Sequence, residues 1–266
     1  MSKEQTEVQR KTVLITGASS GIGYELALVF ARNNYDLVLV ARSGEKLKSM
    51  AREFRADYGV HTKVIPTDLS VPDSAAQVFE EIENSGIEID VLINNAGIGN
   101  CGFFHETELA KDMQLLQLNI VTLTHLTKLV ARKMVARQSG KILNVASTGA
   151  YQAGPLIATY YASKAYVLSF SEALANELKP FNIQVTTLCP GATKTEFAKR
   201  AGKGDLRVAM APRRVAEIGY RGLMKNKRIV IPGKLNKVLV LMTRILPRRV
   251  SARLVRRYQA RAINMK

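Results

Sequence analysis

Two residues in the stretch TYYASK, at positions 159–164, have the types and the spacing needed for proton transfer. Tyr160 and Lys164 project from one face if this stretch is a helix, because residues i and i+4 are neighbours there. A tyrosine hydroxyl has an ordinary pKa of about 10 and is a poor acid–base group near neutral pH. A nearby ammonium group favours the phenolate, and lowering that pKa to about 7 takes ~4 kcal/mol. Tyr161, at i,i+3 from the lysine, remains a conceivable alternative.

The elements that must position these residues alternate between apolar strands and amphipathic segments of helix length. The strands are predicted at 12–16, 36–41, 61–66, 90–96, 140–147, 182–190 and 228–233, and the helices at 21–32, 43–57, 72–85, 107–138, 158–179 and 212–225. Most of these strands are near-continuous apolar runs, which is typical of strands buried on both faces of a parallel sheet. The repeated βα units predict one doubly wound α/β domain of the Rossmann type, with a seven-stranded, mainly parallel sheet flanked by helices. At 266 residues and 47% hydrophobic composition, the chain can fill the core of such a domain.

In a sheet of this kind the ligand lies beyond the carboxyl ends of the strands, so the residues that follow each strand are candidates for binding it. The first strand is followed by TGASSGIG, which contains Gly17, Ser19, Ser20, Gly21, Ile22 and Gly23. Glycines allow a tight turn there and let backbone N–H groups approach a pyrophosphate at a helix N-terminus. Many strand–helix turns need glycine, and this spacing differs from the usual dinucleotide pattern. The position directly after the first strand is therefore the stronger signal.

The second strand ends in Ala41-Arg42-Ser43. A site selective for a bare ribose usually places Asp or Glu here to bind the 2′-hydroxyl, and the chain has neither. Arg42 instead offers a planar, permanently charged fork to a 2′-phosphate, which predicts a preference for NADP(H). The alternative is a surface arginine at the start of a helix.

Two further strand ends supply candidates. The third strand is followed by Asp68 and Leu69, and the fourth by Asn95, Ala96 and Gly97. Asp68 could accept a hydrogen bond from an adenine amino group, or it could cap a helix beginning near Val71, as Ser70 could also do. The Asn-Ala-Gly sequence suits a backbone that passes close to a ligand, although a plain turn uses the same residue types.

Taken in order, these motifs resemble those of the short-chain dehydrogenase/reductase family, in the branch whose chains are of this length. TGASSGIG is similar to the cofactor turn of that family, NNAG to its fourth-strand motif, and YYASK to its Y-x-x-x-K element. Asn119, Ser147 and the stretch PGATKT, from Pro190 to Thr195, match three further motifs at the expected intervals. Each motif is weak by itself, but six in the right order over roughly residues 10–235 are a strong match.

The resemblance selects Tyr160 as the acid–base residue and implies hydride transfer between NADP(H) and a carbonyl or secondary alcohol. It implies that Lys164 lowers the Tyr160 pKa, helped by the oxidised nicotinamide, and holds the nicotinamide ribose. Ser147 would orient the substrate carbonyl, and Asn119 would hold a water that links Lys164 to solvent. The residues implied near the nicotinamide carboxamide are Pro190, Gly191, Thr193 and Thr195, where Thr193 stands at a position that is often aliphatic. The family also implies a homodimer or homotetramer formed through the long helices.

The net charge of +17 is concentrated near the C-terminus, where Ile218 and all later positions include fourteen Lys or Arg and no Asp or Glu. We expect residues 1–233 to form the cofactor-binding and catalytic domain and residues 234–266 a basic amphipathic helical extension, with Val250, Leu254 and Tyr258 on one stripe. Such a helix suits an anionic membrane surface, a cover over the substrate mouth, or packing, for example on a second subunit. The chain has no recognisable motif for reading nucleic acid.

Residues 193–212 contain glycines and many charges, which predicts a mobile lid over the substrate, with an ordinary surface loop as the alternative. The apolar segment 237–246 weakly favours a lipophilic substrate, such as a 3-oxoacyl or steroid-like carbonyl. The rival hypothesis is a non-catalytic NADP(H)-binding module that docks to a membrane or partner through its basic tail. The intact set of Ser147, Tyr160 and Lys164 argues against that rival.

Several classes of protein are disfavoured. The three histidines show no ligand spacing, so no metal site is predicted. Two distant cysteines without a C-x-x-C pattern predict reduced thiols. The polar N-terminus lacks the apolar region of a secretory signal, and no run approaches the ~18 apolar residues of a spanning helix. The sequence therefore predicts a cytoplasmic protein, in contact with a membrane at its surface at most.

Overall fold

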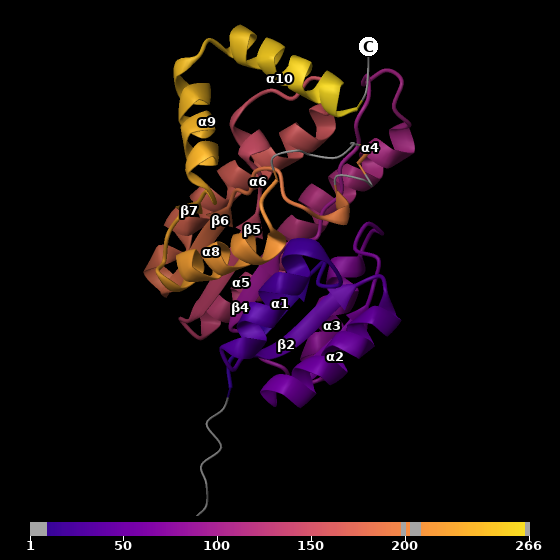
Figure 1. The fold of residues 1–266 in the computed structure, drawn as a ribbon. Coiled ribbons are helices and arrows are strands. Elements are labelled where there is room, and N and C mark those ends of the chain that lie inside the picture. The colour runs from indigo at the N-terminus through magenta and orange to yellow at the C-terminus, as the bar shows by residue number, and fades with distance from the viewer. Residues whose placement is uncertain (1–9, 198–200, 203–208, 264–266) are drawn as a thin grey trace, which may run out of the picture.

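The computed structural model describes residues 10–197, 201–202 and 209–263. A seven-stranded sheet with the strand order β3-β2-β1-β4-β5-β6-β7 runs through the middle of the molecule (Figure 1). The strands are β1 Thr12–Thr16, β2 Asp36–Ala41, β3 Thr62–Pro66, β4 Val91–Asn94, β5 Gly140–Val145, β6 Ile183–Leu188 and β7 Ile229–Val230. Every neighbouring pair is parallel, which confirms the predicted doubly wound sheet. The strand order reverses between β1 and β4, so the switch point lies at their carboxyl ends.

Helices cover both faces of the sheet. The larger ones are α1 Gly21–Arg32, α2 Gly44–Tyr58, α3 Ser74–Asn84, α5 Leu123–Ala136, α6 Ala158–Glu177 and α8 Pro212–Met224. Alternate residues of β1 enter different cores, because successive strand residues point to opposite faces. Val13 and Ile15 pack with α1, α2 and α8, whereas Leu14 packs with α3, α5 and α6. Two apolar layers therefore hold the strand ends in fixed positions.

The helix predicted at 107–138 is present, but it contains a π-helical turn that the sequence did not predict. The structure has α4 Leu109–Leu116, then a π-helical turn, η1 Gln117–Thr122, and then α5. A π turn adds a residue to the local repeat, and such turns often occur at functional sites. The side chain of Asn119, inside this turn, bonds the backbone of Ile98, which ties the turn to the segment after β4.

The C-terminal extension consists of two helices, α9 Lys234–Ile245 and α10 Arg248–Ala262, separated by Leu246 and Pro247. Leu246 is extended, as expected for a residue before proline, so the chain turns there. In Figure 1, α10 runs back above the N-terminal end of α6. Among the described residues, no helix combines the length and apolar character that a bilayer crossing needs.

Candidate active site

Tyr160 and Lys164 lie on α6 and converge with Ser147, which follows β5. The Ser147 and Tyr160 side chains form a hydrogen bond. The Lys164 side chain is only 4% exposed, and its Nζ lies 5.8 Å from the centre of the Tyr160 ring. This Nζ donates a 2.8 Å hydrogen bond to the carbonyl of Val145 at the end of β5. The strand end and the helix therefore bring a hydroxyl pair and a buried cation together.

Ser147 is held by the loop that it begins. Its backbone is extended, and its Oγ accepts a 3.0 Å hydrogen bond from the N–H of Gly149 at the start of the short 3-10 helix η2 Thr148–Tyr151. The N–H of Thr148 in turn donates to the carbonyl of Pro190, 2.9 Å away, beyond β6. The serine hydroxyl is thus oriented by two neighbouring strand ends.

The pKa of the Tyr160 hydroxyl is raised above its ordinary value, because burial disfavours the phenolate more than the hydrogen bond with Ser147 favours it. In the protein chain by itself burial dominates this pKa, and the role of Lys164 in lowering it stays a prediction. Burial also lowers the pKa of Lys164 to about 8 from its usual 10.5. Near neutral pH the pair is a protonated phenol beside an ammonium group.

Asn119 is fully buried in the π turn, and both ends of its amide are hydrogen-bonded. Its Oδ1 accepts from the N–H of Ile98, and its Nδ2 donates to the carbonyl of Ile98 and to the Oγ of Ser163, all at 3.0 Å. A Cβ placed on Gly97 would lie 3.2 Å from Asn119 Oδ1 and 3.4 Å from Lys164 Nζ. The asparagine, the glycine after β4 and the lysine therefore meet at one point. The water-holding role of Asn119 stays a prediction.

The glycine turn after β1 is packed too tightly for side chains. Gly17 has φ +65°, and a Cβ on Gly23 would lie 2.2 Å from the Gly17 carbonyl oxygen. A Cβ on Gly21 would lie 2.9 Å from Thr195 Cγ2, so the PGATKT element reaches this turn. Ser20 makes no side-chain cap to α1, whose first turn has no acidic residue. The N–H groups of that turn therefore fit an anionic group such as a pyrophosphate.

Asn95 holds this turn in place. Its Nδ2 donates to the carbonyls of Thr16 and Gly17, at 2.9 and 3.1 Å. Thr16 Oγ1 accepts from the N–H groups of Asn95 and Ala96, at 3.0 and 3.1 Å. The Asn95 amide is thus used on the protein backbone. Thr16 was not among the site residues predicted from the sequence, although its place at the end of β1, directly before Gly17, is a usable signal.

Arg42 is exposed at the end of β2, and Asp68 lies beside it at the end of β3. Asp68 Oδ1 accepts from the N–H and the hydroxyl of Ser70, at 3.0 and 2.7 Å. Burial raises the pKa of Asp68, but these bonds and the charge of Arg42 lower it overall. Because α3 begins at Ser74 with Asp73 as its N-cap, neither Asp68 nor Ser70 caps it, and that alternative is wrong. Leu69 is buried, and its carbonyl accepts a bond from Thr122.

The PGATKT element forms a self-bonded turn after β6. Thr193 Oγ1 donates to the carbonyl of Gly191 at 3.1 Å, so its hydroxyl is satisfied locally. A Cβ on Gly191 would lie 2.4 Å from Oδ1 of Asn236 on α9, which brings the start of the extension against this turn. Of the predicted lid, residues 198–200 and 203–208 lie outside the described residues. The Phe197 ring is tilted against the Tyr160 ring, with centres 5.3 Å apart, and it contacts Gly99.

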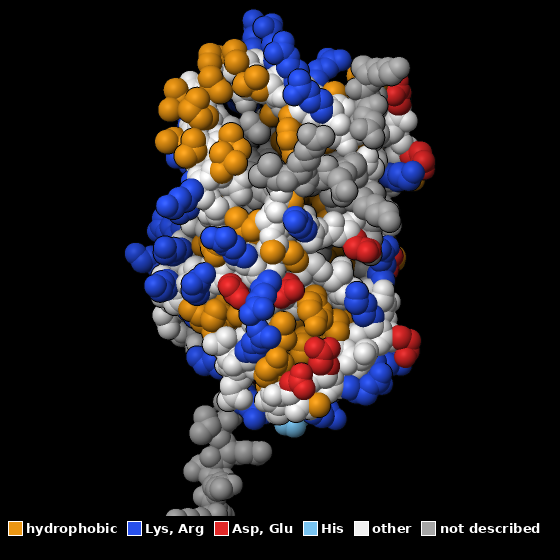
Figure 2. Space-filling model, viewed as in Figure 1, with side chains coloured by type: hydrophobic (Ala, Val, Ile, Leu, Met, Phe, Trp, Pro, Cys, Tyr) orange, Lys and Arg blue, Asp and Glu red, His pale blue; other side chains and the backbone are white. Residues whose placement is uncertain are grey.

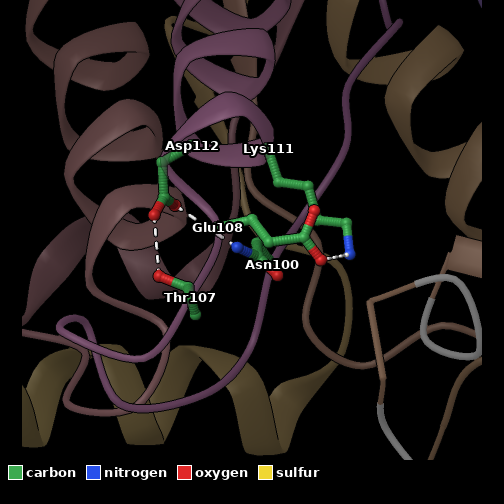
Figure 3. A network of polar contacts seen from close by, with 5 residues as sticks. All are labelled: Asn100, Thr107, Glu108, Lys111 and Asp112. Atoms are coloured by element: carbon green, nitrogen blue, oxygen red, sulfur yellow. Dashed lines mark hydrogen bonds and ion pairs between the residues drawn. The ribbon is translucent and has the colours of Figure 1, made fainter.

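A polar network anchors the segment after β4, which forms another wall of the site (Figure 3). Asp112 on α4 accepts from Thr107 Oγ1 at 2.8 Å and from Asn100 Nδ2 at 3.5 Å. At the surface beside them, Lys111 pairs with Glu108. Because the Asp112 carboxylate is buried and hydrogen-bonded, the loop that contains Asn100 is fastened to α4.

Helix α10 bridges the loops on either side of the site. Ser251 Oγ donates to Gln152 Oε1, and Gln259 Nε2 donates to the hydroxyl of Tyr161, both at 2.9 Å. The Arg256 guanidinium lies 5.8 Å from the centre of the Phe103 ring. The extension therefore packs across the loops that follow β4 and β5. Gln259 and Phe197 were not among the site residues predicted from the sequence, because no motif contains them.

Comparison with known proteins identifies the family. A family model described as short chain dehydrogenase matches residues 11–205. The very-long-chain 3-oxoacyl-CoA reductase of Phaeosphaeria nodorum is 36% identical over 70% of this chain and 56% of the relative. The mouse 17-beta-hydroxysteroid dehydrogenase type 3 is 34% identical over 70% of this chain and 61% of the relative. A solved short-chain dehydrogenase from Sphingobium yanoikuyae, in complex with NADPH, is 36% identical with a TM-score of 0.80, covering 84% of this chain and 88% of that one.

The chain belongs to the short-chain dehydrogenase family, as the match to its model over most of the sequence shows. It spans little more than half the length of the very-long-chain 3-oxoacyl-CoA reductase to which it is similar. Among the described residues, no group of His, Cys, Asp and Glu side chains could hold a metal ion.

Proposed function

We propose that this protein is an NADP(H)-dependent oxidoreductase that transfers a hydride between the nicotinamide and a carbonyl or secondary alcohol. The observation that carries the proposal is that Ser147 contacts Tyr160 next to the buried Lys164. Beside them lies the glycine turn after β1, and the N–H groups in the first turn of α1 are available to bind an anion. We assign residues 1–233 to cofactor binding and catalysis and residues 234–266 to the basic extension. The bound cofactor supplies or accepts the hydride.

In the direction of reduction, the hydroxyls of Ser147 and Tyr160 hold the substrate carbonyl oxygen. As the C–H bond forms and the carbonyl π bond breaks, the Tyr160 hydroxyl gives its proton to the oxygen. Its raised pKa keeps the phenol protonated at neutral pH, and the transfer is still favourable because an aliphatic alkoxide is the stronger base. Lys164 then returns a proton to the phenolate, and we assign Asn119 the water that connects Lys164 to solvent.

The residues proposed to hold the cofactor come from the ends of five strands, β1, β2, β3, β4 and β6, and from helix α6. They are Gly17, Ser19, Ser20, Gly21, Ile22, Gly23, Arg42, Asp68, Leu69, Asn95, Ala96, Gly97, Tyr160, Lys164, Pro190, Gly191, Thr193 and Thr195. Exposed Arg42 would pair with the 2′-phosphate, and the similarity to a structure in complex with NADPH supports this. Asn95 contributes indirectly, because its side-chain amide donates hydrogen bonds to the backbone carbonyls of Thr16 and Gly17 and so fixes the glycine turn.

We propose a lipophilic substrate of the 3-oxoacyl or steroid-like class. The relatives named as a 3-oxoacyl-CoA reductase and a hydroxysteroid dehydrogenase support that class. Aromatic rings beside the catalytic tyrosine support it further, because the ring centres of Phe197 and Tyr161 lie 5.3 and 6.1 Å from that of Tyr160. Apolar and aromatic walls with a few polar groups are typical of sites for such ligands.

The test follows the loss of NADPH absorbance, with NADH in parallel, over ketones and 3-oxoacyl thioesters of graded chain length. We expect turnover with NADPH, rates that rise with chain length, and no turnover in Tyr160→Phe. Tight NADPH binding without turnover of any carbonyl would instead favour the rival, a non-catalytic binding module. That rival also requires that Tyr160→Phe leave the biological role intact while truncation after Gly233 abolishes it.

We propose that the protein forms a homodimer or homotetramer through α4, η1 and α6. Leu109, Met113, Val121 and Tyr166 expose apolar surface along these helices, which supports a shared interface. Light scattering after size exclusion should give a multiple of 29.3 kDa, and Val121→Glu should shift it towards the monomer. Val71→Glu, at a residue equally exposed on another surface, is the control. A monomeric wild-type protein contradicts the proposal.

We also propose that α9 and α10 contact an anionic membrane surface. Leu235, Val238, Leu239, Leu241, Met242 and Ile245 on α9 are 43–70% exposed. Figure 2 shows these apolar side chains gathered over α9, with Lys and Arg side chains over α10. An apolar face beside basic residues and no acidic ones suits the boundary between acyl chains and anionic headgroups.

Co-sedimentation with lipid vesicles tests this contact. Vesicles that contain phosphatidylserine should bind the protein, and vesicles of phosphatidylcholine alone should bind it weakly. The double variant Leu241→Glu/Ile245→Glu should lose binding, and Val71→Glu, which changes an exposed apolar residue before α3, should keep it. Equal binding by the double variant and the wild type would overturn the assignment of α9.

A further inference from the structure

Gln259 on α10 is a buried amide with only one end satisfied. It is 1% exposed, and its Nε2 donates to the Tyr161 hydroxyl at 2.9 Å. Its Oε1 is also buried and has no hydrogen-bond partner among the described residues. Buried side-chain oxygens nearly always have a partner, so an unpaired one next to a catalytic residue needs an explanation.

The position of Gln259 links it to the site. Its partner Tyr161 is the chain neighbour of Tyr160, with ring centres 6.1 Å apart. The Tyr161 ring also packs against Gly149 and Gly154 in the loop after β5, where a Cβ on either glycine would come within 3.0 Å of it. Gln259 therefore reaches the catalytic end of α6 from the far end of the chain.

The hydrogen bonds and contacts of α10 keep this amide in place. The Ser251–Gln152 bond fastens the beginning of the helix to the loop after β5, and Arg256 over Phe103 fastens its middle to the loop after β4. A bond from Nε2 to Tyr161 is enough to dock the helix, and it leaves the carbonyl oxygen unused. Gln259 Oε1 is therefore an unused hydrogen-bond acceptor. Its position is fixed by the contacts of α10 with Gln152, Phe103 and Tyr161.

We propose that Gln259 is a specificity-determining residue whose Oε1 accepts a hydrogen bond from a neutral donor on the substrate, remote from the carbonyl that reacts. The proposal rests on the proposed function and names a chemical feature of its substrate. A hydroxyl group and an amide N–H both supply such a donor. An ammonium donor is disfavoured, because every ionised side chain from Ile218 onwards is cationic.

Matched pairs of ketones test the proposal. One pair is a steroid ketone with and without a hydroxyl group at its far end. The other is a 3-oxoacyl thioester of N-acetylcysteamine, which carries an amide N–H, and the S-butyl thioester of the same acid, which does not. We expect the wild type to favour one donor-bearing member by roughly tenfold in kcat/KM, mainly through KM, because the donor binds alike in ground and transition states. The preferred pair identifies the donor as hydroxyl or amide.

Gln259→Met keeps the length of the side chain and removes both ends of the amide. It should reduce the donor preference to about one while kcat for the donor-free ketone stays the same. Tyr161→Phe is the control, because it removes the docking bond and keeps Oε1, so it should retain most of the preference. Two results would show that the amide only docks the helix. One is an unchanged donor preference in Gln259→Met. The other is a complete loss of the donor preference in Tyr161→Phe together with a lower rate for the donor-free ketone.

A binding measurement keeps this result separate from a failure of the proposed reaction. In Tyr160→Phe with NADPH, the donor-bearing ketone should raise Tm more than the donor-free one, without any turnover. The difference should vanish in Tyr160→Phe/Gln259→Met. Equal shifts in both proteins overturn the proposal for Gln259, whereas loss of turnover in the wild type would count against the reaction alone.

Discussion

The two halves of the site are built in different ways. Around the glycine turn, hydrogen bonds between neighbouring strand ends hold the residues in place. For example, Thr16 at the end of β1 and Asn95 after β4 are bonded through their side chains and backbones. On the substrate side, the walls come from segments far apart in the chain, as when Gln259 bonds Tyr161 across 98 positions. The first half depends on sheet geometry, and the second on how the C-terminal extension docks.

This difference implies that the halves can be changed separately. Substitutions at the glycine turn should affect the cofactor and leave substrate preference intact. Substitutions on α10 should do the reverse. Tyr160 and Lys164 lie between the halves, so changing them should affect the reaction itself.

The largest effect is expected where the halves meet. Tyr160→Phe removes the proton donor, and general acid–base groups typically contribute 10²–10⁴-fold, so kcat should fall by about that factor. Steady-state assays with NADPH measure it. Fluorescence titration should give an unchanged NADPH Kd, because the ring remains. Tyr161→Phe should keep kcat within a few-fold, and a larger loss there would mean that the roles of the two tyrosines are misassigned.

A strong effect confined to the cofactor half is expected for Gly23→Ala. The added Cβ would lie 2.2 Å from the Gly17 carbonyl oxygen, so the turn must open and its N–H groups must move. NADPH affinity should fall by about a hundredfold or more, since lost charge-assisted bonds of roughly 1.5–3 kcal/mol each add up. Isothermal titration calorimetry measures this affinity.

Gly44→Ala is the control for the glycine turn, because its Cβ would lie 3.2 Å from the Pro66 side chain, a contact that a shift of a few tenths of an ångström relieves. It should bind NADPH like the wild type. If Gly23→Ala altered substrate preference as much as cofactor affinity, the two halves would not be separable.

Arg42→Ala tests how the cofactor half distinguishes NADPH from NADH. Loss of an arginine–phosphate pair should weaken NADPH by roughly ten- to a hundredfold and leave NADH almost unchanged, because only NADPH carries the 2′-phosphate. The ratio of kcat/KM values for the two cofactors is the measurement. Arg52→Ala, at an exposed arginine of α2, is the control. An equal loss for both cofactors would show that Arg42 does not distinguish them.

The pH dependence of kcat/KM should reflect the ionisation of Lys164. Its pKa of about 8 makes it the first site group to lose a proton as the pH rises, so kcat/KM for reduction should fall about tenfold per pH unit above 8. The residual activity of Lys164→Arg should not show this decline, because arginine stays charged. A profile that is flat to pH 10 would contradict the assignment.

Lys164 should also affect stability, with a defined sign. Its pKa is lower in the folded protein than the usual 10.5, so burial of the ammonium destabilises the fold at every pH below about 8. That cost is lost as the pH rises from about 8 towards 10.5. Denaturant unfolding of Lys164→Met and the wild type should therefore differ less at pH 10 than at pH 7.

The smallest effect belongs to the substrate half. Ser251→Ala removes one bond that docks α10, and such a bond contributes about 1 kcal/mol. KM for the carbonyl substrate should rise by a few-fold, while the NADPH Kd stays the same. Ser85→Ala, at an exposed serine after α3, is the control. A change in NADPH Kd of similar size would mean that α10 also supports the cofactor half.

Much of the fold could be predicted because strand residues carry their own signal. The bounds of β1 and β2 agree with the apolar runs 12–16 and 36–41, since a strand buried on both faces must be apolar throughout. The helix through 107–138 was predicted without its π turn. Its side-chain pattern continues through the π turn, and the turn is stabilised by bonds from Asn119 to a distant backbone.

The amino-acid sequence by itself determined the order of strands and helices, the family motifs at the strand ends, and the pairing of Tyr160 with Lys164 on one helix. Each of these depends on residues close together in the chain, where spacing is enough. Only the tertiary structure decided that burial raises the Tyr160 pKa, that the Asn95 amide clamps the glycine turn, and that Gln259 reaches Tyr161. These features depend on desolvation and on contacts between distant segments, which exist only once the sheet and the C-terminal helices have packed together.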